Sequence, residues 1–171
     1  MIDVTTAARR FLAEQESLTT LLGGDSTYKT WIFRWRPYVK VEGSGKSLLV
    51  VRQSGSWASA NAHNTMRFPR LIVEVWSDVQ RAESGLSKQN VTRAATAEDA
   101  AQAISLELDK YLHRVAGGDV VWGREVDDMD VVTDPGLRII GCYRQGEPDI
   151  RELQGGDGAV VASNTYTVTV G

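Results

Sequence analysis

The spacing of apolar residues predicts two helices. The first spans residues 3–22 and ends at Gly23-Gly24, and the second spans residues 96–114 and ends at Gly117-Gly118, because glycine tolerates the left-handed conformation of a helix stop. Each helix has one apolar stripe at helical spacing, so each is expected to pack one face against a core. Residues able to cap the helix starts are Asp3, Thr5, Thr6 and Thr96. The stripes comprise Val4, Ala8, Phe11, Leu12, Leu18 and Leu22 in the first helix and Ala97, Ala100, Ala101, Ile104, Leu108, Tyr111 and Leu112 in the second.

Alternation of apolar and polar residues predicts strands in much of the remaining chain. The first predicted strand has a buried aromatic face formed by Trp31, Phe33 and Trp35. The last has an apolar inward face that is interrupted only by Asn164. Strands are expected at residues 30–36, 38–41, 47–53, 70–77, 119–122, 130–133, 137–144 and 159–170.

The order of these elements predicts an α+β fold. Helix, strands, helix and more strands, without an internal repeat or a linker, indicate a single domain over residues 1–171 with a mostly antiparallel sheet and two main helices on one side. Small and polar residues predict long loops at 54–69 and 145–158. Asp134-Pro135-Gly136 predicts a turn that leads into a return strand at 137–144.

Composition and charge are those of an ordinary globular protein. Hydrophobic residues make up 42% of the 171 residues and charged residues 24%, and the formal net charge of −3 implies no overall attraction to nucleic acid. The single cysteine, Cys142, is expected to be a small buried hydrophobe, and no internal disulfide can form. We expect neither a signal peptide nor a membrane span, because no apolar run approaches about 18–20 residues.

The segment EGSGKSLLVVR at residues 42–52 contains GSGKS, which resembles part of a phosphate-binding loop. Two requirements of that motif fail. The first glycine would stand at position 40, which is Lys40, and the residues after Ser47 are typical of a strand instead of a helix. We therefore interpret GSG as a hairpin turn.

The histidines and acidic residues suggest no catalytic or metal site. His63 lies in a polar loop and His113 ends a helix, where the helix dipole favours a positive charge, and neither has a nucleophile in a recognisable frame. An acidic run offers carboxylates that can ligate a hard cation, but it lacks the pattern of a calcium-binding loop, so a solvated turn is the favoured interpretation. The run comprises Glu125, Asp127, Asp128 and Asp130.

Aromatic and basic residues instead suggest contact surfaces. Four of the five tryptophans lie in predicted strands, but Trp57 lies in the polar loop, where an exposed aromatic ring often awaits a partner. Basic residues cluster in the first β region, and three interpretations stay open: a solvated sheet face, charge pairing with a neighbouring subunit, or a nucleic-acid patch. These residues are Arg34, Arg36, Lys40, Arg52, Arg67 and Arg70.

No set of residues forms a catalytic constellation, so the protein is expected to be no enzyme and to use no cofactor or metal. It is expected to act through its surfaces. The candidate contact residues are Arg34, Arg36, Trp57, His63, Arg67, Glu74 and Trp76.

Several segments together resemble a known family. An amphipathic helix ending in LLGG is followed by PYVKVEGSGKSLLVVRQSGSW, then by RLIVEVWSD, the alanine-rich ATAEDAAQAISLELDKYL and the final strand NTYTVTV. This order, which covers most of the chain, resembles the tail terminator (tail completion) proteins of long-tailed bacteriophages. Residues 119–158 are longer than small members of that family lead one to expect.

The resemblance implies a structural role in the virion, at the head–tail junction, after assembly in the host cytoplasm. Such proteins form a ring, expected to be hexameric, that caps the tail tube, ends its polymerisation and offers a surface for the head connector. The implied partners are further copies of the chain, the tail tube protein and the head–tail connector protein. DNA would pass through the ring without sequence-specific binding, and no membrane would be involved.

Three other functions compete with this interpretation. A head–tail connector or neck protein has a similar size and fold class. A small ligand-binding or enzymatic α+β domain would need a pocket with convergent polar groups. A nucleic-acid binder using the arginine-rich strands would show a steep dependence of DNA affinity on salt.

Overall fold

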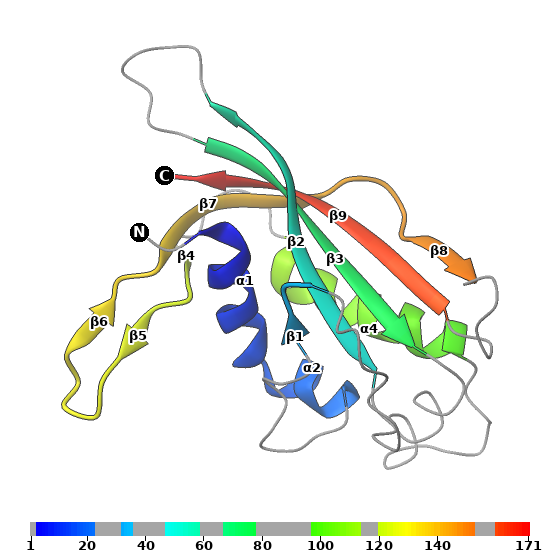
Figure 1. Ribbon diagram of the computed structural model, residues 1–171, viewed down its shortest axis with the longest axis horizontal. Coiled ribbons are helices and arrows are strands. Elements are labelled where there is room, and N and C mark those ends of the chain that lie inside the picture. The colour runs from blue at the N-terminus through cyan, green and yellow to red at the C-terminus, as the bar shows by residue number, and fades with distance from the viewer. Residues whose placement is uncertain are drawn as a thin grey trace.

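Three long strands with alternating apolar residues form the centre of the sheet: β2 (Leu48–Ala58), β3 (Arg67–Ser77) and β9 (Val160–Val170). The computed structural model describes residues 3–22, 32–35, 47–58, 67–77, 97–113, 120–152 and 160–171, with the side chains of 56–58 and 67 excepted. Within these residues the α+β prediction is confirmed, because helices cover one face of a curled, mostly antiparallel sheet (Figure 1).

The main sheet has seven strands in the order β1-β2-β3-β9-β7-β4, and β8 also pairs with β9. All the neighbours are antiparallel except β1 and β2, which are parallel. The remaining main-sheet strands are β1 (Ile32–Phe33), β4 (Val120–Trp122), β7 (Leu137–Arg144) and β8 (Asp149–Glu152). A separate two-stranded hairpin consists of β5 (Glu125–Val126) and β6 (Val132–Asp134).

The helices are α1 (Val4–Ala13), α2 (Glu16–Leu21) and α4 (Ala97–Leu112). The predicted helix at 3–22 is thus two helices, broken where Gln15 adopts an extended backbone. Gln15 occupies a position that would continue the apolar stripe, and its side chain instead donates a hydrogen bond to the carbonyl oxygen of Phe11 at 2.8 Å. The break re-aims the next turn so that Leu18 and Leu22 are buried in the core. Asp3 caps α1 as expected, accepting from the Thr6 amide at 3.0 Å.

The core lies between the helices and the inner face of the sheet. Leu71, Val73 and Val75 point into it, as the alternation predicts. Asn164 is a buried polar residue on the inner face of β9, and its Nδ2 donates to the carbonyl oxygen of Val73 at 3.3 Å and to Ser105 Oγ at 3.0 Å. These bonds tie the middle of β9 to β3 and to α4.

The predicted aromatic face of residues 30–36 is wrong. Ile32 is the buried residue in β1, Phe33 is half-buried, and Trp35 is 72% exposed. Pairing of Ile32 with Leu49 fixes this register, and the Ile32 carbonyl oxygen accepts a hydrogen bond from Arg9 of α1. Since apolar residues occupy both sets of alternate positions, the pattern did not distinguish the two faces.

The predicted loop at 54–69 is largely strand where it is described. β2 runs on to Ala58 and β3 begins at Arg67, with an irregularity between Gln53 and Ser56 where Gly55 has a φ of 72°. Small polar residues therefore extend the hairpin, because pairing with the neighbouring strand outweighs their weak strand propensity.

The predicted loop at 145–158 also contains a strand, because β8 pairs with the first part of β9. β7 pairs with the last part of β9, so β7 and β8 follow one another along the same side of that strand, as Figure 1 shows. The Gln145 amide donates to the Thr165 carbonyl oxygen at 2.7 Å, which keeps the intervening residues close to the ladder.

Other predictions lie outside the described residues: the stops at Gly23-Gly24 and Gly117-Gly118, the strand at 38–41, the GSG turn, Arg36 and His63. The strand that follows GSGKS is confirmed as β2. Of the helices in the described parts of the chain, none combines the length and the apolar character that crossing a membrane requires.

Candidate interaction site

The β5–β6 hairpin projects away from the sheet and the helices (Figure 1). We call residues 124–134 the arm. Sequence reasoning placed a strand at 130–133 and returned it against 137–144, but β6 pairs with β5 instead. Gly136, in the predicted turn, leads the chain from the arm back into the main sheet, where it continues as β7.

The base of the arm is fixed to α1 by Arg10. The guanidinium forms ion pairs of 3.0 Å with Glu125 and with Asp134, and it donates to the Gly123 carbonyl oxygen at 3.3 Å. The Gly136 amide and Arg10 hold the pKa of Asp134 below its ordinary value. The arm therefore keeps a defined direction relative to the core.

Gly136 adds a steric constraint at the same base. Its φ is 74°, and a Cβ there would lie 2.5 Å from the Trp122 carbonyl oxygen and 2.8 Å from the Arg124 amide nitrogen. Trp122 is buried and stacks on Phe11 with ring centroids 5.4 Å apart. The close approach that only glycine permits joins the arm directly to the packed core.

The tip of the arm is organised by Asp127. One carboxylate oxygen accepts from the amides of Met129 at 2.9 Å and Val131 at 2.8 Å, and Asp130 adopts a left-handed φ of 60°. The acidic run is thus a turn, as favoured from the sequence. Among the described residues no three histidine, cysteine, aspartate or glutamate side chains are grouped as metal ligands.

The arm exposes apolar side chains although it has its own hydrogen-bonded structure. Met129 is 80% exposed, and three valines of the arm are exposed with it. The same short segment carries five carboxylates and one arginine, so the apolar tip lies in an acidic setting. A concentration of exposed apolar side chains on a rigid projection is typical of a protein–protein contact. The three valines are Val126, Val131 and Val132.

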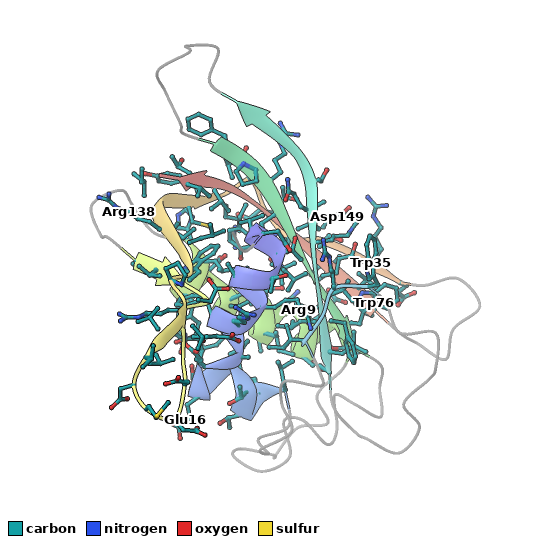
Figure 2. The ribbon with its side chains drawn as sticks, turned by 60° about the vertical axis from the view of Figure 1, so that its left-hand side comes forward. Arg9, Glu16, Trp35, Trp76, Arg138 and Asp149 are labelled. Carbon is teal, nitrogen blue, oxygen red and sulfur yellow. The ribbon has the colours of Figure 1, made fainter. Side chains whose placement is uncertain are left out.

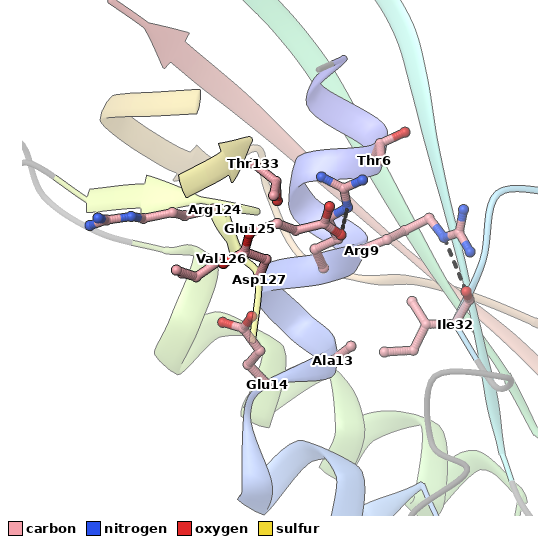
Figure 3. Close-up of a pocket in the computed structure, with 11 residues that line it drawn as sticks. Thr6, Arg9, Ala13, Glu14, Ile32, Arg124, Glu125, Val126, Asp127 and Thr133 are labelled. Atoms are coloured by element: carbon pink, nitrogen blue, oxygen red, sulfur yellow. Dashed lines mark hydrogen bonds and ion pairs between the residues drawn. The ribbon is translucent and has the colours of Figure 1, made fainter. Parts of the chain in front are cut away.

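A pocket of about 660 Å³ lies over α1, between the arm and β1 (Figure 3). Arg9 crosses its floor and donates from Nε to the Ile32 carbonyl oxygen at 3.1 Å. Burial lowers the pKa of Arg9, the nearby Arg34 lowers it further, and Asp3 partly offsets both effects. The described lining residues are Thr6, Arg9, Arg10, Ala13, Glu14, Ile32, Arg124, Glu125, Val126, Asp127 and Thr133.

The charges along the lining of this pocket suit recognition of a partner protein. Cations and carboxylates are balanced along its lining, and Arg10 is already paired with Glu125. Threonine hydroxyls and the carboxylates of Glu125 and Asp127 face the same space, and Thr6 hydrogen-bonds to Asp3. Such a surface suits a polar segment of a partner.

A second candidate surface lies on the face of the sheet away from the helices. Phe33 and Trp76 pack there on the buried Leu48 and Val50, and Trp35 is exposed next to β1. We call Phe33, Trp35 and Trp76, together with the neighbouring Arg34, the aromatic patch, and the Arg34 side chain extends from it toward Asp3 at the start of α1. Figure 2 shows Trp35 and Trp76 on the opposite side of the molecule from the arm.

Charged residues border the aromatic patch. Trp76 Nε1 donates to Glu74 at 3.2 Å, and Arg52 binds the same carboxylate with its Nε at 3.0 Å and Nη2 at 2.5 Å. Arg34 lies 3.6 Å from Asp3. Arg52 and Glu74 thus satisfy each other within the chain, which agrees with a solvated sheet face at that position.

Of the predicted contact residues, Glu74 and Trp76 are joined by a hydrogen bond at the aromatic patch, whereas Arg34 pairs with Asp3 at the start of α1. Trp57 and Arg67 lie at the opposite end of the β2–β3 pair, where Trp57 is in a strand and not in the predicted loop. The apolar residues of the arm were missed. A signal was present in the sequence, since MDVV sets three apolar residues within the acidic run.

Two residues considered from the sequence have structural roles. Nδ1 of His113 accepts a hydrogen bond from the Arg144 amide at 2.9 Å, which joins the end of α4 to β7. Cys142 is buried as expected, and burial together with Asp109 raises the pKa of its thiol to about 12. A thiol with such a pKa stays protonated and is a poor nucleophile.

The fold class is therefore α+β, with one helical layer on a mostly antiparallel sheet. No family model matches the sequence, and no curated protein matches it. Among solved structures, the fold is similar to that of a chain in a structure described as "Virion of native gene transfer agent (GTA) particle". The TM-score is 0.50 at 15% sequence identity, and the match covers 98% of this chain and 93% of the other.

Proposed function

We propose that this chain is a structural protein of a phage-like particle and acts there as a tail terminator. In this role it forms a ring, a hexamer by the family resemblance, at the head–tail junction. The ring caps the tail tube, ends its polymerisation and presents a surface to the head connector, while DNA passes through without sequence-specific binding.

One observation carries the proposal: the fold is shared over almost the full length of both chains with a component of a virion. The match extends over 98% of this chain and 93% of the other, so the similarity is not limited to one common motif. The order of segments that resembles tail terminators points to the same class of particle. Two independent comparisons, of sequence pattern and of fold, thus support a virion component.

The surfaces also suit a subunit of a ring. A ring requires two unlike patches on each subunit that meet head to tail. The arm and the aromatic patch are unlike in shape, since one projects and the other lies on a sheet face, and they occupy different sides of the molecule (Figure 2). The pocket over α1 offers a further contact for a tube or connector protein.

Negative-stain images of the purified protein, with and without tail tubes, test the proposal. We expect rings, and we expect them on one end of each tube, with tube growth stopped when the protein is added during polymerisation. Binding to the portal side with no effect on tubes would indicate a neck protein instead. A monomer that never associates and binds a small molecule stoichiometrically in the pocket over α1 would contradict a structural role altogether.

A further inference from the structure

The arm presents apolar side chains that are exposed and that none of the described residues covers. Met129 and Val131 are exposed on a tip whose backbone is held by Asp127. A turn whose backbone is already ordered loses little backbone entropy when a partner covers it, so this tip is suited to binding. If the arm cannot fold back, the described part of this molecule offers no cover for the tip, and a partner molecule is the natural source of one.

The arm cannot fold back onto the aromatic patch of the same molecule. Arg10 holds its base to α1 through Glu125 and Asp134, and Gly136 fits against the backbone of Trp122. The patch lies on the other side of the molecule, and α1 stands between the arm and β1, as Figures 2 and 3 show. Contact between the two surfaces within one chain would require the base to break.

The two surfaces are complementary in chemistry. The arm combines exposed methionine and valine side chains with five carboxylates. The aromatic patch combines the exposed Trp35 ring with Arg34, and Arg9 lies near enough for Arg34 to depress its pKa. The guanidiniums of Arg9 and Arg34 lie near each other and near Asp3, so an added anionic group would be attracted to them. The exposed Trp35 indole would be stabilised by apolar side chains that remove it from water.

We propose that the arm of one copy docks on the aromatic patch of the next copy, with Met129 and Val131 covering Trp35 and the acidic turn facing Arg34. This inference rests on the proposed ring. Because the two surfaces differ and lie on opposite sides, the contact is heterologous and repeats from copy to copy until the ring closes. The occupant of the patch is thus a second copy of this chain.

Disulfide trapping tests this contact directly, since the chain's single cysteine is buried. The variants M129C and W35C are prepared separately, mixed under assembly conditions and oxidised. We expect a crosslinked dimer that contains one copy of each variant. L106C is the matched control, because Leu106 is 65% exposed on α4, away from both surfaces, and we expect no crosslink between it and either variant.

A charge swap provides an independent measurement. D128R on the arm and R34E at the patch should each weaken self-association by about tenfold, the loss typical of an important interface residue. Mixing the two variants should restore association, because each then offers the charge that the other lacks. Asp128 is exposed in the arm, so D128R should leave the fold intact by circular dichroism.

The outcomes separate this contact from the proposed function. Rings that form without the M129C–W35C crosslink, or with an M129C–M129C crosslink in its place, would overturn the arm contact and leave the ring standing. Arm variants that form rings but no longer cap tubes would assign the arm to the tube protein, which also overturns it. A protein that forms no rings at all would overturn both proposals.

Discussion

The centre of the sheet and the arm use the same residue types in opposite ways. In β3, Leu71, Val73 and Val75 are fully buried against the helices. In the arm, Met129 and Val131 belong to an equally well-defined hydrogen-bonded element, yet they face outward. The sheet centre buries its apolar surface within the chain, whereas the arm has no second layer to bury it against.

This difference shows that backbone order and apolar burial have separate causes here. The sheet centre is stabilised by removal of apolar surface from water. The arm is held by polar contacts instead: a carboxylate that accepts two amides at the tip and an arginine that pairs with two carboxylates at the base. Apolar side chains that do not contribute to folding remain available for binding.

The largest expected contrast is between alanine substitutions in the two regions, measured as the change in the free energy of unfolding. Leu71→Ala should lower the free energy of unfolding by about 2–5 kcal/mol, because it removes buried methyl groups and leaves a cavity. Met129→Ala should change it by no more than about 0.5 kcal/mol, as for an exposed side chain. Chemical denaturation of both variants measures the contrast, and equal losses would mean that the arm is part of the folding core.

Removing a partly buried charge should have the next largest effect on the free energy of unfolding. Asp109 accepts a hydrogen bond from Tyr166 at 2.7 Å and forms an ion pair with Arg144, so it joins α4 to β9 and β7. Asp109→Asn should cost about 1–3 kcal/mol, the range for hydrogen bonds to charged groups left partly unsatisfied. Asp128→Asn in the arm is the matched control and should be neutral in the same thermal or chemical melts.

Acidification should affect the helical layer through Glu107. Burial alone would raise the pKa of this carboxyl, but hydrogen bonds from Lys110 and Ser17 lower it below the ordinary value of 4.5. A carboxylate with a lowered pKa in the folded state contributes stability above pH 4.5, and that contribution is lost as the pH falls through the folded-state pKa. Glu107→Gln should flatten the decline of the unfolding free energy below that pH, and an unchanged decline would assign it to other carboxyls.

The smallest effect on global stability should come from releasing the base of the arm. Arg10→Gln removes the ion pairs with Glu125 and Asp134, which lie at the surface and contribute little to global stability. Hydrogen exchange at the Val131 amide should nevertheless accelerate, while exchange in β3 and β9 stays slow. If exchange accelerates equally in both regions, the arm unfolds only together with the sheet.

The sequence predicted the position and orientation of those strands in which only one of the two faces is apolar. The strands β3 and β9 were correct in place and in orientation, with Asn164 as the inward polar residue, and β7 matched the predicted range. Orientation failed in β1, where apolar residues occupy both faces and only pairing with Leu49 decides between them. The break at Gln15 depends on the packing of Leu18, which periodicity alone does not reveal.

The candidate site was harder to predict than the fold. Glu74 and Trp76 are among the predicted contact residues and are joined by a hydrogen bond, but their role in a contact stays a prediction. The arm was not predicted as a contact surface. Its carboxylates suggested cation binding, and its valines are typical of an ordinary strand. Exposure is a property of the tertiary arrangement, and local sequence predicts it only where a second layer can be foreseen.

The position of β9 between β3 on one side and β7 and β8 on the other governs when the protein becomes usable. All of its neighbours are synthesised before it, so a nascent chain that stops short of residue 160 has two half-sheets with open edges. Open edges of apolar strands pair indiscriminately and aggregate. Translation of β9 therefore joins the two half-sheets into one, so a chain truncated before residue 160 is expected to aggregate.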